Sequence, residues 1–141
     1  MDIGNAASSR ADFYDRNADV NILRFATNLV PHGLTIRDIY TVPVGRKAIV
    51  GSMASFCMRQ GVAGTTGSVL MYYKYTPNGG APVIVKYDLF VSSVVNDRLF
   101  TVITPTFAMY PGDVLTISTA DGSVGGNITY DLTSVITEFD Y

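Results

Sequence analysis

Two corners built from proline and glycine constrain this chain more than any other feature of its sequence. Pro43-Val44-Gly45 interrupts an apolar, β-branched stretch from residue 39 to 59, and Pro111-Gly112 interrupts a similar stretch from 108 to 118. Proline removes a backbone donor and glycine permits a positive φ, so a ladder of backbone hydrogen bonds must break at each corner. The pattern of strand, corner and strand, found twice, predicts a small β-sandwich with turns stacked at its ends.

Alternating and β-branched segments fill most of the remaining chain. Turn residues separate them, as in Thr76-Pro77-Asn78-Gly79-Gly80, where Asn-Gly is typical of a hairpin. The expected strands are residues 35–42, 48–59, 68–75, 83–91, 99–103, 114–119 and 127–139. Within the second of these we expect Ile49, Met53 and Phe56 to anchor the core. This spacing predicts an all-β protein with a single β-sandwich or jelly-roll-like domain.

The N-terminal part of the chain differs in composition. Residues 1–18 are mostly small and polar, which is typical of an arm that cannot bury enough surface to order alone. Residues 20–29 are more apolar and fit either a short amphipathic helix or a strand from Val20 to Phe25. We therefore expect an N-terminal arm and linking segment over 1–33, a sandwich domain over 34–141, and little helix beyond residues 20–30.

The composition limits the function classes. At 141 residues one domain is expected, and 16% charged residues is low against about 25% in typical proteins. Little charge and many aromatics favour a surface covered by partners, so we expect a symmetric homo-oligomer, a homotrimer. A net charge of −2 without charge blocks argues against nucleic-acid binding. The chain has neither a membrane-spanning apolar run nor a basic-then-apolar leader pattern, so we expect no membrane association and synthesis in a cytoplasm.

Residues with reactive side chains are few. Cys57, the single cysteine, lies in an apolar strand and is interpreted as a small buried hydrophobe, while His32 lies in a loop beside Pro31. Residues 15–26 imitate a calcium loop but place Val20 where that loop needs glycine and Ala26 where it needs glutamate. We therefore expect no catalytic residues, no metal site, no cofactor and no enzymatic activity.

Candidate partner-binding residues come from two places. In the arm, Ile3, Phe13 and Tyr14 supply apolar anchors, and Arg10 and Arg16 can pair with carboxylates. In the expected strand 68–75, two tyrosines share one face and, if exposed, offer rings to a partner protein or a sugar. Packing of the two in the core or across strands is the alternative. These two residues are Tyr73 and Tyr75.

The corner sequences resemble those of small tailed-bacteriophage virion proteins. The stretch Thr41-Val42-Pro43-Val44-Gly45-Arg46-Lys47-Ala48-Ile49-Val50, the glycine-rich loop at 60–67 and Tyr110-Pro111-Gly112-Asp113-Val114-Leu115 carry the resemblance, over residues 35 to 139. Met109-Tyr110-Pro111 departs from the usual Leu-x-x pattern. Among these proteins, capsid decoration (cement) proteins are most similar in size: compact, often trimeric modules with a terminal arm and a β-sandwich or jelly-roll domain.

The resemblance implies a structural virion protein that binds the major capsid protein and stabilises the shell. It also implies a location on the capsid surface after assembly in the host cytoplasm. A tail, baseplate or fibre-attachment protein is the first alternative. A carbohydrate-binding β-sandwich module is the second, and a small jelly-roll enzyme is disfavoured because such enzymes usually carry several histidines.

Overall fold

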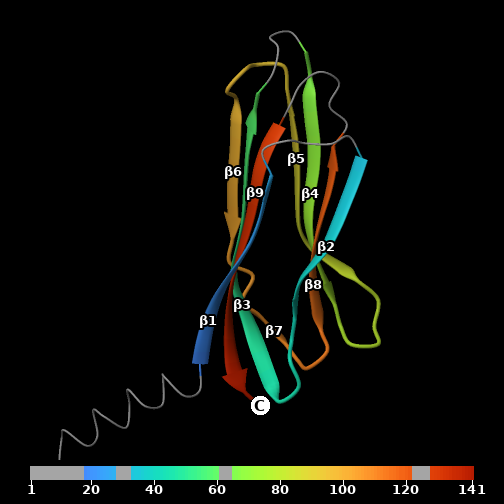
Figure 1. Ribbon diagram of the computed structural model, residues 1–141, viewed down its shortest axis with the longest axis vertical. Helices are drawn as coiled ribbons and strands as arrows, with labels where there is room; N and C mark the ends of the chain where they lie inside the picture. Colours follow the sequence, from blue (N-terminus) through green and yellow to red (C-terminus); the bar gives the residue numbers. More distant parts are fainter. Residues whose placement is uncertain (1–17, 28–32, 61–64, 122–127) are drawn as a thin grey trace, which may run out of the picture.

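The structure, a computed structural model, describes residues 18–27, 33–60, 65–121 and 128–141. In these ranges the chain forms nine strands and no helix (Figure 1). The strands are β1 Ala18–Thr27, β2 Gly33–Thr41, β3 Arg46–Arg59, β4 Gly67–Thr76, β5 Val83–Ser92, β6 Arg98–Ile103, β7 Phe107–Met109, β8 Val114–Asp121 and β9 Ile128–Asp140. Accordingly, no described helix has the length and apolar character to cross a bilayer.

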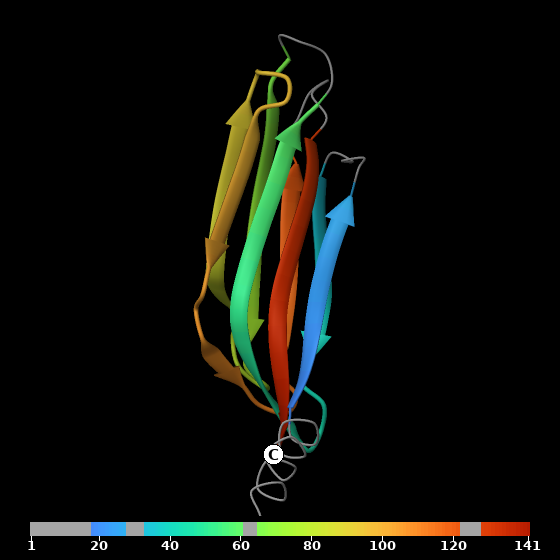
Figure 2. The same ribbon diagram turned by 90° about the vertical axis from the view of Figure 1, so that its left-hand side faces the viewer.

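The strands pair antiparallel in a nested order. β1 pairs with β9, β2 with β8, β3 with both β6 and β7, and β4 with β5. Two sheets result, the first in the order β1-β9-β3-β6 with β7 also on β3, and the second in the order β2-β8-β4-β5. They lie face to face in Figure 2. A long hairpin rolled into two sheets in this way is a jelly roll. The expected all-β sandwich is therefore confirmed.

The first strand lies inside the segment that we expected to be an arm and a linker. Residues 18–27 form β1, which pairs with β9 over its whole length, from Ala18 opposite Phe139 to Thr27 opposite Tyr130. The strand alternative for residues 20–29 is thus the one that the structure shows. The sandwich therefore begins before residue 34, where we expected its boundary. The rest of the expected arm and linking segment, residues 1–17 and 28–32, lies outside the described residues.

The core lies between the sheets and follows the period of two in each strand. β3 is the exception, because its pairing with β9 shifts by one residue between Val50 and Ser52. Before this bulge the even-numbered residues point inward, and after it the odd-numbered ones do. Met53 is fully buried as expected, but Ile49 and Phe56 are only half-buried on the other face, so their assignment as core anchors was wrong.

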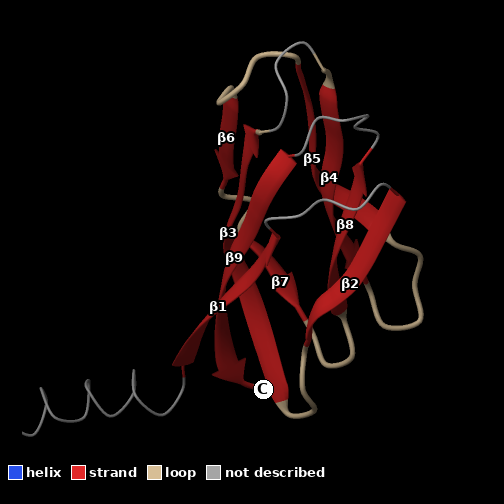
Figure 3. Cartoon of the chain, turned by 45° about the horizontal axis from the view of Figure 1, so that its top comes forward, coloured by secondary structure: helices blue, strands red, loops and turns tan. Residues whose placement is uncertain are grey.

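The two proline–glycine corners meet at one end of the sandwich. The amide of Val42 donates to the carbonyl of Asp113 at 3.0 Å, and the amide of Gly112 donates to the carbonyl of Val42 at 3.0 Å. Gly45 and Gly112 have φ of 78° and 86°, which L side chains rarely adopt. The loops after β2 and β7 and the C-terminus lie at this same end (Figure 3). The stacked turns expected from the sequence are therefore confirmed.

Candidate functional site

Strand β5 has its apolar face outside and its charged face inside. Tyr87, Leu89 and Val91 are 55%, 53% and 55% exposed, whereas Lys86 and Phe90 on the other face of the strand are buried. The solvent-exposed face of an antiparallel sheet is normally the polar one. β5 is also the last strand of its sheet, paired only with β4. We refer to Tyr87, Leu89 and Val91 as the β5 strip.

Strand β6 of the other sheet also exposes apolar side chains. Phe100 and Val102 are 67% and 49% exposed, while Leu99 and Ile103 pack against the core. β6 is the last strand of the first sheet beyond β3, and Phe100 lies opposite Phe56 in the ladder. We refer to Phe100 and Val102 as the β6 strip. The two strips lie on the opposite outer faces of the sandwich, because the inward side chains of β5 and β6 meet each other.

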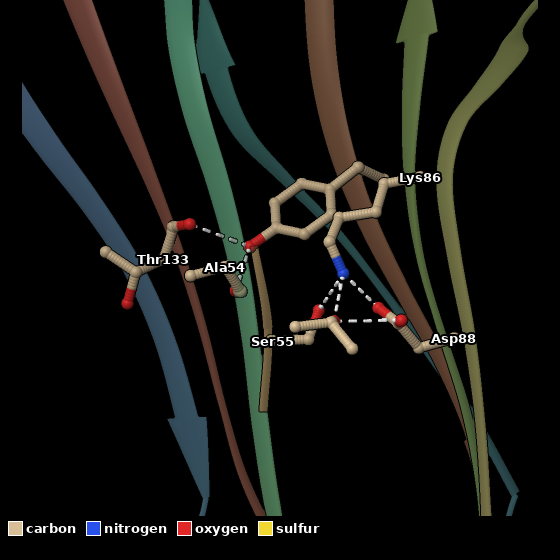
Figure 4. Close-up of polar contacts among 7 residues, drawn as sticks. Ala54, Ser55, Lys86, Asp88 and Thr133 are labelled. Carbon is tan, nitrogen blue, oxygen red and sulfur yellow. Dashed lines mark hydrogen bonds and ion pairs between the residues drawn. The ribbon is translucent and has the colours of Figure 1, made fainter. Parts of the chain in front are cut away.

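That meeting point is a buried polar cluster between the strips (Figure 4). Lys86 Nζ lies 3.0 Å from Ser55 Oγ and 2.6 Å from Thr101 Oγ1, and it forms an ion pair with Asp88. Thr101 in turn donates to Asp88 Oδ1 at 2.9 Å. The cluster joins β5 to β6 and β3 across the two sheets. It therefore brings the edge strands β5 and β6 to one edge of the sandwich, which carries both strips.

Tyr73 lies in the core, so it presents no ring to a partner. It is fully buried, and its hydroxyl lies 2.9 Å from the carbonyl oxygen of Ala54 and 3.0 Å from that of Thr133 (Figure 4). Burial, followed by the charges of Asp131 and Asp88, raises the pKa of the Tyr73 hydroxyl. The core-packing alternative describes this residue, and its hydroxyl links the second sheet to two strands of the first.

Tyr75 is half-buried and also directed to an internal partner. Its hydroxyl donates to Asp113 Oδ2 at 2.7 Å, and its ring packs 5.3 Å from the ring of Phe107. Burial and then the hydrogen bond to Asp113 raise the pKa of Tyr75 to about 12. The exposed tyrosine of this sheet is instead Tyr87, which stacks on Tyr72 with ring centroids 6.0 Å apart.

Asp113 holds the turns at the corner end together. Its Oδ1 accepts from the amide of Asn78 at 2.8 Å, and its Oδ2 accepts from the amide of Tyr110 at 2.9 Å as well as from Tyr75. Burial alone would raise the pKa of Asp113, but the hydrogen bonds from Tyr110, Asn78 and Tyr75 outweigh it and lower that pKa. The carboxylate has a structural task, which the Pro-Gly-Asp sequence did not reveal.

Some of the residues singled out in the sequence lie in the described part of the chain, and others lie outside it. Cys57 is fully buried, and burial raises the pKa of its thiol to about 12, so the interpretation as a buried hydrophobe is confirmed. No group of three or more potential metal ligands occurs within the described ranges. The arm residues that we expected to bind a partner lie outside the described residues, as does His32. These arm residues are Ile3, Arg10, Phe13, Tyr14 and Arg16.

Sequence reasoning missed the two strips. The signal was present, because residues 83–91 alternate between an apolar face and a face that contains Lys86 and Asp88. The usual rule turns the apolar face inward. The rule fails here because Lys86 and Asp88 on the inward face of β5 form an ion pair with each other and hydrogen-bond to a hydroxyl from β6 and one from β3. Those partners come from distant parts of the chain.

Comparisons with known proteins give remote structural likeness only. No protein-family model matches the chain, and no curated protein sequence matches it. A crystal structure of PirA is 10% identical, with a TM-score of 0.43 over 89% of this chain and 94% of PirA. A tumour necrosis factor, Eiger from S. frugiperda, is 11% identical, with a TM-score of 0.43 over 89% and 94% of the two chains. A chain of the empty head of Turnip Yellow Mosaic Virus is 9% identical, with a TM-score of 0.43 over 87% of this chain and 80% of the viral chain.

Proposed function

We propose that this chain is a structural protein of a virus particle, a capsid decoration protein that binds the major capsid protein and stabilises the shell. In this proposal it acts through protein contacts, without a catalytic role. The β5 and β6 strips carry the proposal, because exposed apolar surface gathered at one edge marks a site of protein association. The resemblance of the corner sequences to small phage virion proteins supports the virion as its setting.

The polar side chains of the two internal clusters described above hold the fold together. Lys86, Asp88 and Thr101 bond one another, and Asp113 is taken up by two amides and the Tyr75 hydroxyl. A catalytic group must instead face a substrate. This supports a protein whose function is carried by its surface.

The carbohydrate-binding alternative and the tail-protein alternative receive different support from the structure. The carbohydrate-binding alternative relied on exposed tyrosines together with Asp or Asn residues of the loops, and the hydroxyls of Tyr73 and Tyr75 are directed to internal partners. A tail, baseplate or fibre-attachment protein would likewise act through protein contacts. It therefore remains the alternative that an experiment must separate from the capsid surface.

The proposal is tested by adding the purified full-length chain to purified shells assembled from the major capsid protein of the same genome. We expect saturable co-sedimentation with the shells and a higher temperature of shell disassembly, since a ligand of the assembled state stabilises it by mass action. Immunogold electron microscopy of whole particles should label the shell. Label confined to the tail would support the alternative, and an absence of both label and co-sedimentation would refute a virion role.

A further inference from the structure

The two strips share one edge of the sandwich but lie on its opposite faces. The β5 strip is on the outer face of the second sheet and the β6 strip on the outer face of the first, while the bond between Lys86 Nζ and Thr101 Oγ1 holds both strands at that edge. A single apolar patch pairs with its own copy about a twofold axis. Two different patches on opposite faces allow a head-to-tail contact, which closes into a ring if the rotation permits.

We propose that this edge faces the axis of a closed ring of identical chains, in which the β5 strip of one copy packs on the β6 strip of the next. The occupant of each strip is thus a second copy of this chain. Three copies, the number already expected for this chain, is the smallest ring of this kind. The inference concerns self-association and does not depend on shell binding.

The area of the strips suits such a contact. Their five half-exposed side chains, two of them aromatic, offer on the order of 500 Å² of apolar surface, and interfaces are a little over half apolar. A contact between one β5 strip and one β6 strip with its polar rim therefore buries about 1,000 Å², the lower bound for a specific interface. Each chain takes part in two such contacts, so a ring of three chains is held together by three interfaces.

The edge strands also discourage the other way of joining two sheets. Free strand edges can add a strand from another chain through backbone hydrogen bonds, and inward-pointing charges on an edge strand oppose this. β5 carries two such charges, Lys86 and Asp88. These inward charges therefore favour packing through the outer face of β5 over the addition of another strand to the sheet.

The first test measures the mass of the full-length chain by light scattering and sedimentation velocity. We expect a species of three times the 15.2 kDa chain mass. Leu89→Lys disables only the β5 strip and Phe100→Lys only the β6 strip, and each should weaken assembly at least about 30-fold, as expected for the loss of a central apolar contact. Ile36→Lys is the matched control, because Ile36 is 56% exposed on β2, at the other edge of the sheet, and should leave the mass unchanged.

The second test mixes the two strip variants. If the contact is head-to-tail, the mixture still contains one intact combination of strips. The β5 strip of the Phe100→Lys chain can pack on the β6 strip of the Leu89→Lys chain. An equimolar mixture should therefore form heterodimers, although each variant alone is monomeric. A monomeric or dimeric native chain would overturn the ring, and so would a variant pair in which only one substitution affects the mass. A ring that fails to bind shells would refute the proposed function while this inference stands.

Discussion

Lys86 Nζ on β5 lies 2.6 Å from Thr101 Oγ1 on β6, and this contact closes the edge of the sandwich between its two sheets. Lys86 also pairs with Asp88, and both side chains are largely buried. Removal of one partner leaves an uncompensated charge in the interior, at a cost of about 3–5 kcal/mol. Replacement of both charges by apolar groups of similar volume avoids that cost.

We therefore predict that Lys86→Met lowers the free energy of unfolding by about 3 kcal/mol or more, while Lys86→Met combined with Asp88→Leu recovers most of the loss. Urea unfolding followed by circular dichroism measures both values. Equal destabilisation by the single and double variants would show that the cluster matters through its hydrogen bonds to Ser55 and Thr101 instead of its charges.

Asp113 predicts a dependence of stability on pH. Its pKa is lowered in the folded protein, so the carboxylate stabilises the fold at pH values above its unfolded pKa. This contribution falls as the pH drops below the unfolded pKa and is lost once the pH passes below the folded one. We predict that Asp113→Asn lowers the melting temperature at neutral pH and flattens its decrease in acid.

The measurement is a series of thermal melts from neutral to acidic pH. Asp38→Asn is a suitable control, because Asp38 is exposed and accepts a bond only from the Thr116 hydroxyl among the contacts of the described chain. If Asp113→Asn and the native chain lose stability in parallel as the pH falls, the lowered pKa of Asp113 does not contribute.

Much of the fold could be predicted because its signals are local. Pro43, Gly45 and Pro111 with Gly112 mark corners through their own backbone chemistry, and alternation in residues 127–139 matches β9 within one residue at each end. The bulge in β3 could not be predicted, since it depends on the pairing of Val50 and Ser52 with β9. It turned Ile49 away from the core.

The exposed edge could not be predicted for a related reason. Whether the apolar or the charged face of β5 points inward depends on Ser55 and Thr101, which sequence alone does not place beside Lys86. Tyr73 likewise became a core residue because two carbonyl groups of the opposite sheet lie within reach of its hydroxyl. Local pattern gives the strands, and the partners across the sheets decide what each face does.

Cys57 predicts an unreactive thiol. It is fully buried on β3, and burial raises its pKa to about 12, so the thiolate that attacks electrophiles is scarce at neutral pH. We predict that a thiol reagent such as dithionitrobenzoate modifies the native chain far more slowly than the chain in guanidinium chloride. The denatured sample serves as the control for complete reaction. Prompt reaction of the folded chain would mean that β3 opens readily between β6 and β9.

The last prediction concerns the N-terminal arm. Residues 1–17 contain few apolar side chains, so alone they cannot offset the entropy cost of ordering, whereas Ile3, Phe13 and Tyr14 could anchor them on a capsid subunit. β1 begins at Ala18, which lies opposite Phe139 near the C-terminus. The structure thus separates two deletions, one of residues 1–17 that spares β1 and one of residues 1–27 that removes it.

Deletion of 1–17 should change the melting temperature by only a few degrees and weaken shell binding at least about tenfold, because an extended arm adds contact area that is lost with it. Deletion of 1–27 should destabilise the fold strongly, since it strips one side of β9 of its partner and leaves a long unpaired edge. Thermal melts and co-sedimentation with shells measure the two effects. If the variant without residues 1–17 binds shells fully, the sandwich itself carries the attachment. If that variant unfolds, residues 1–17 belong to the folded domain.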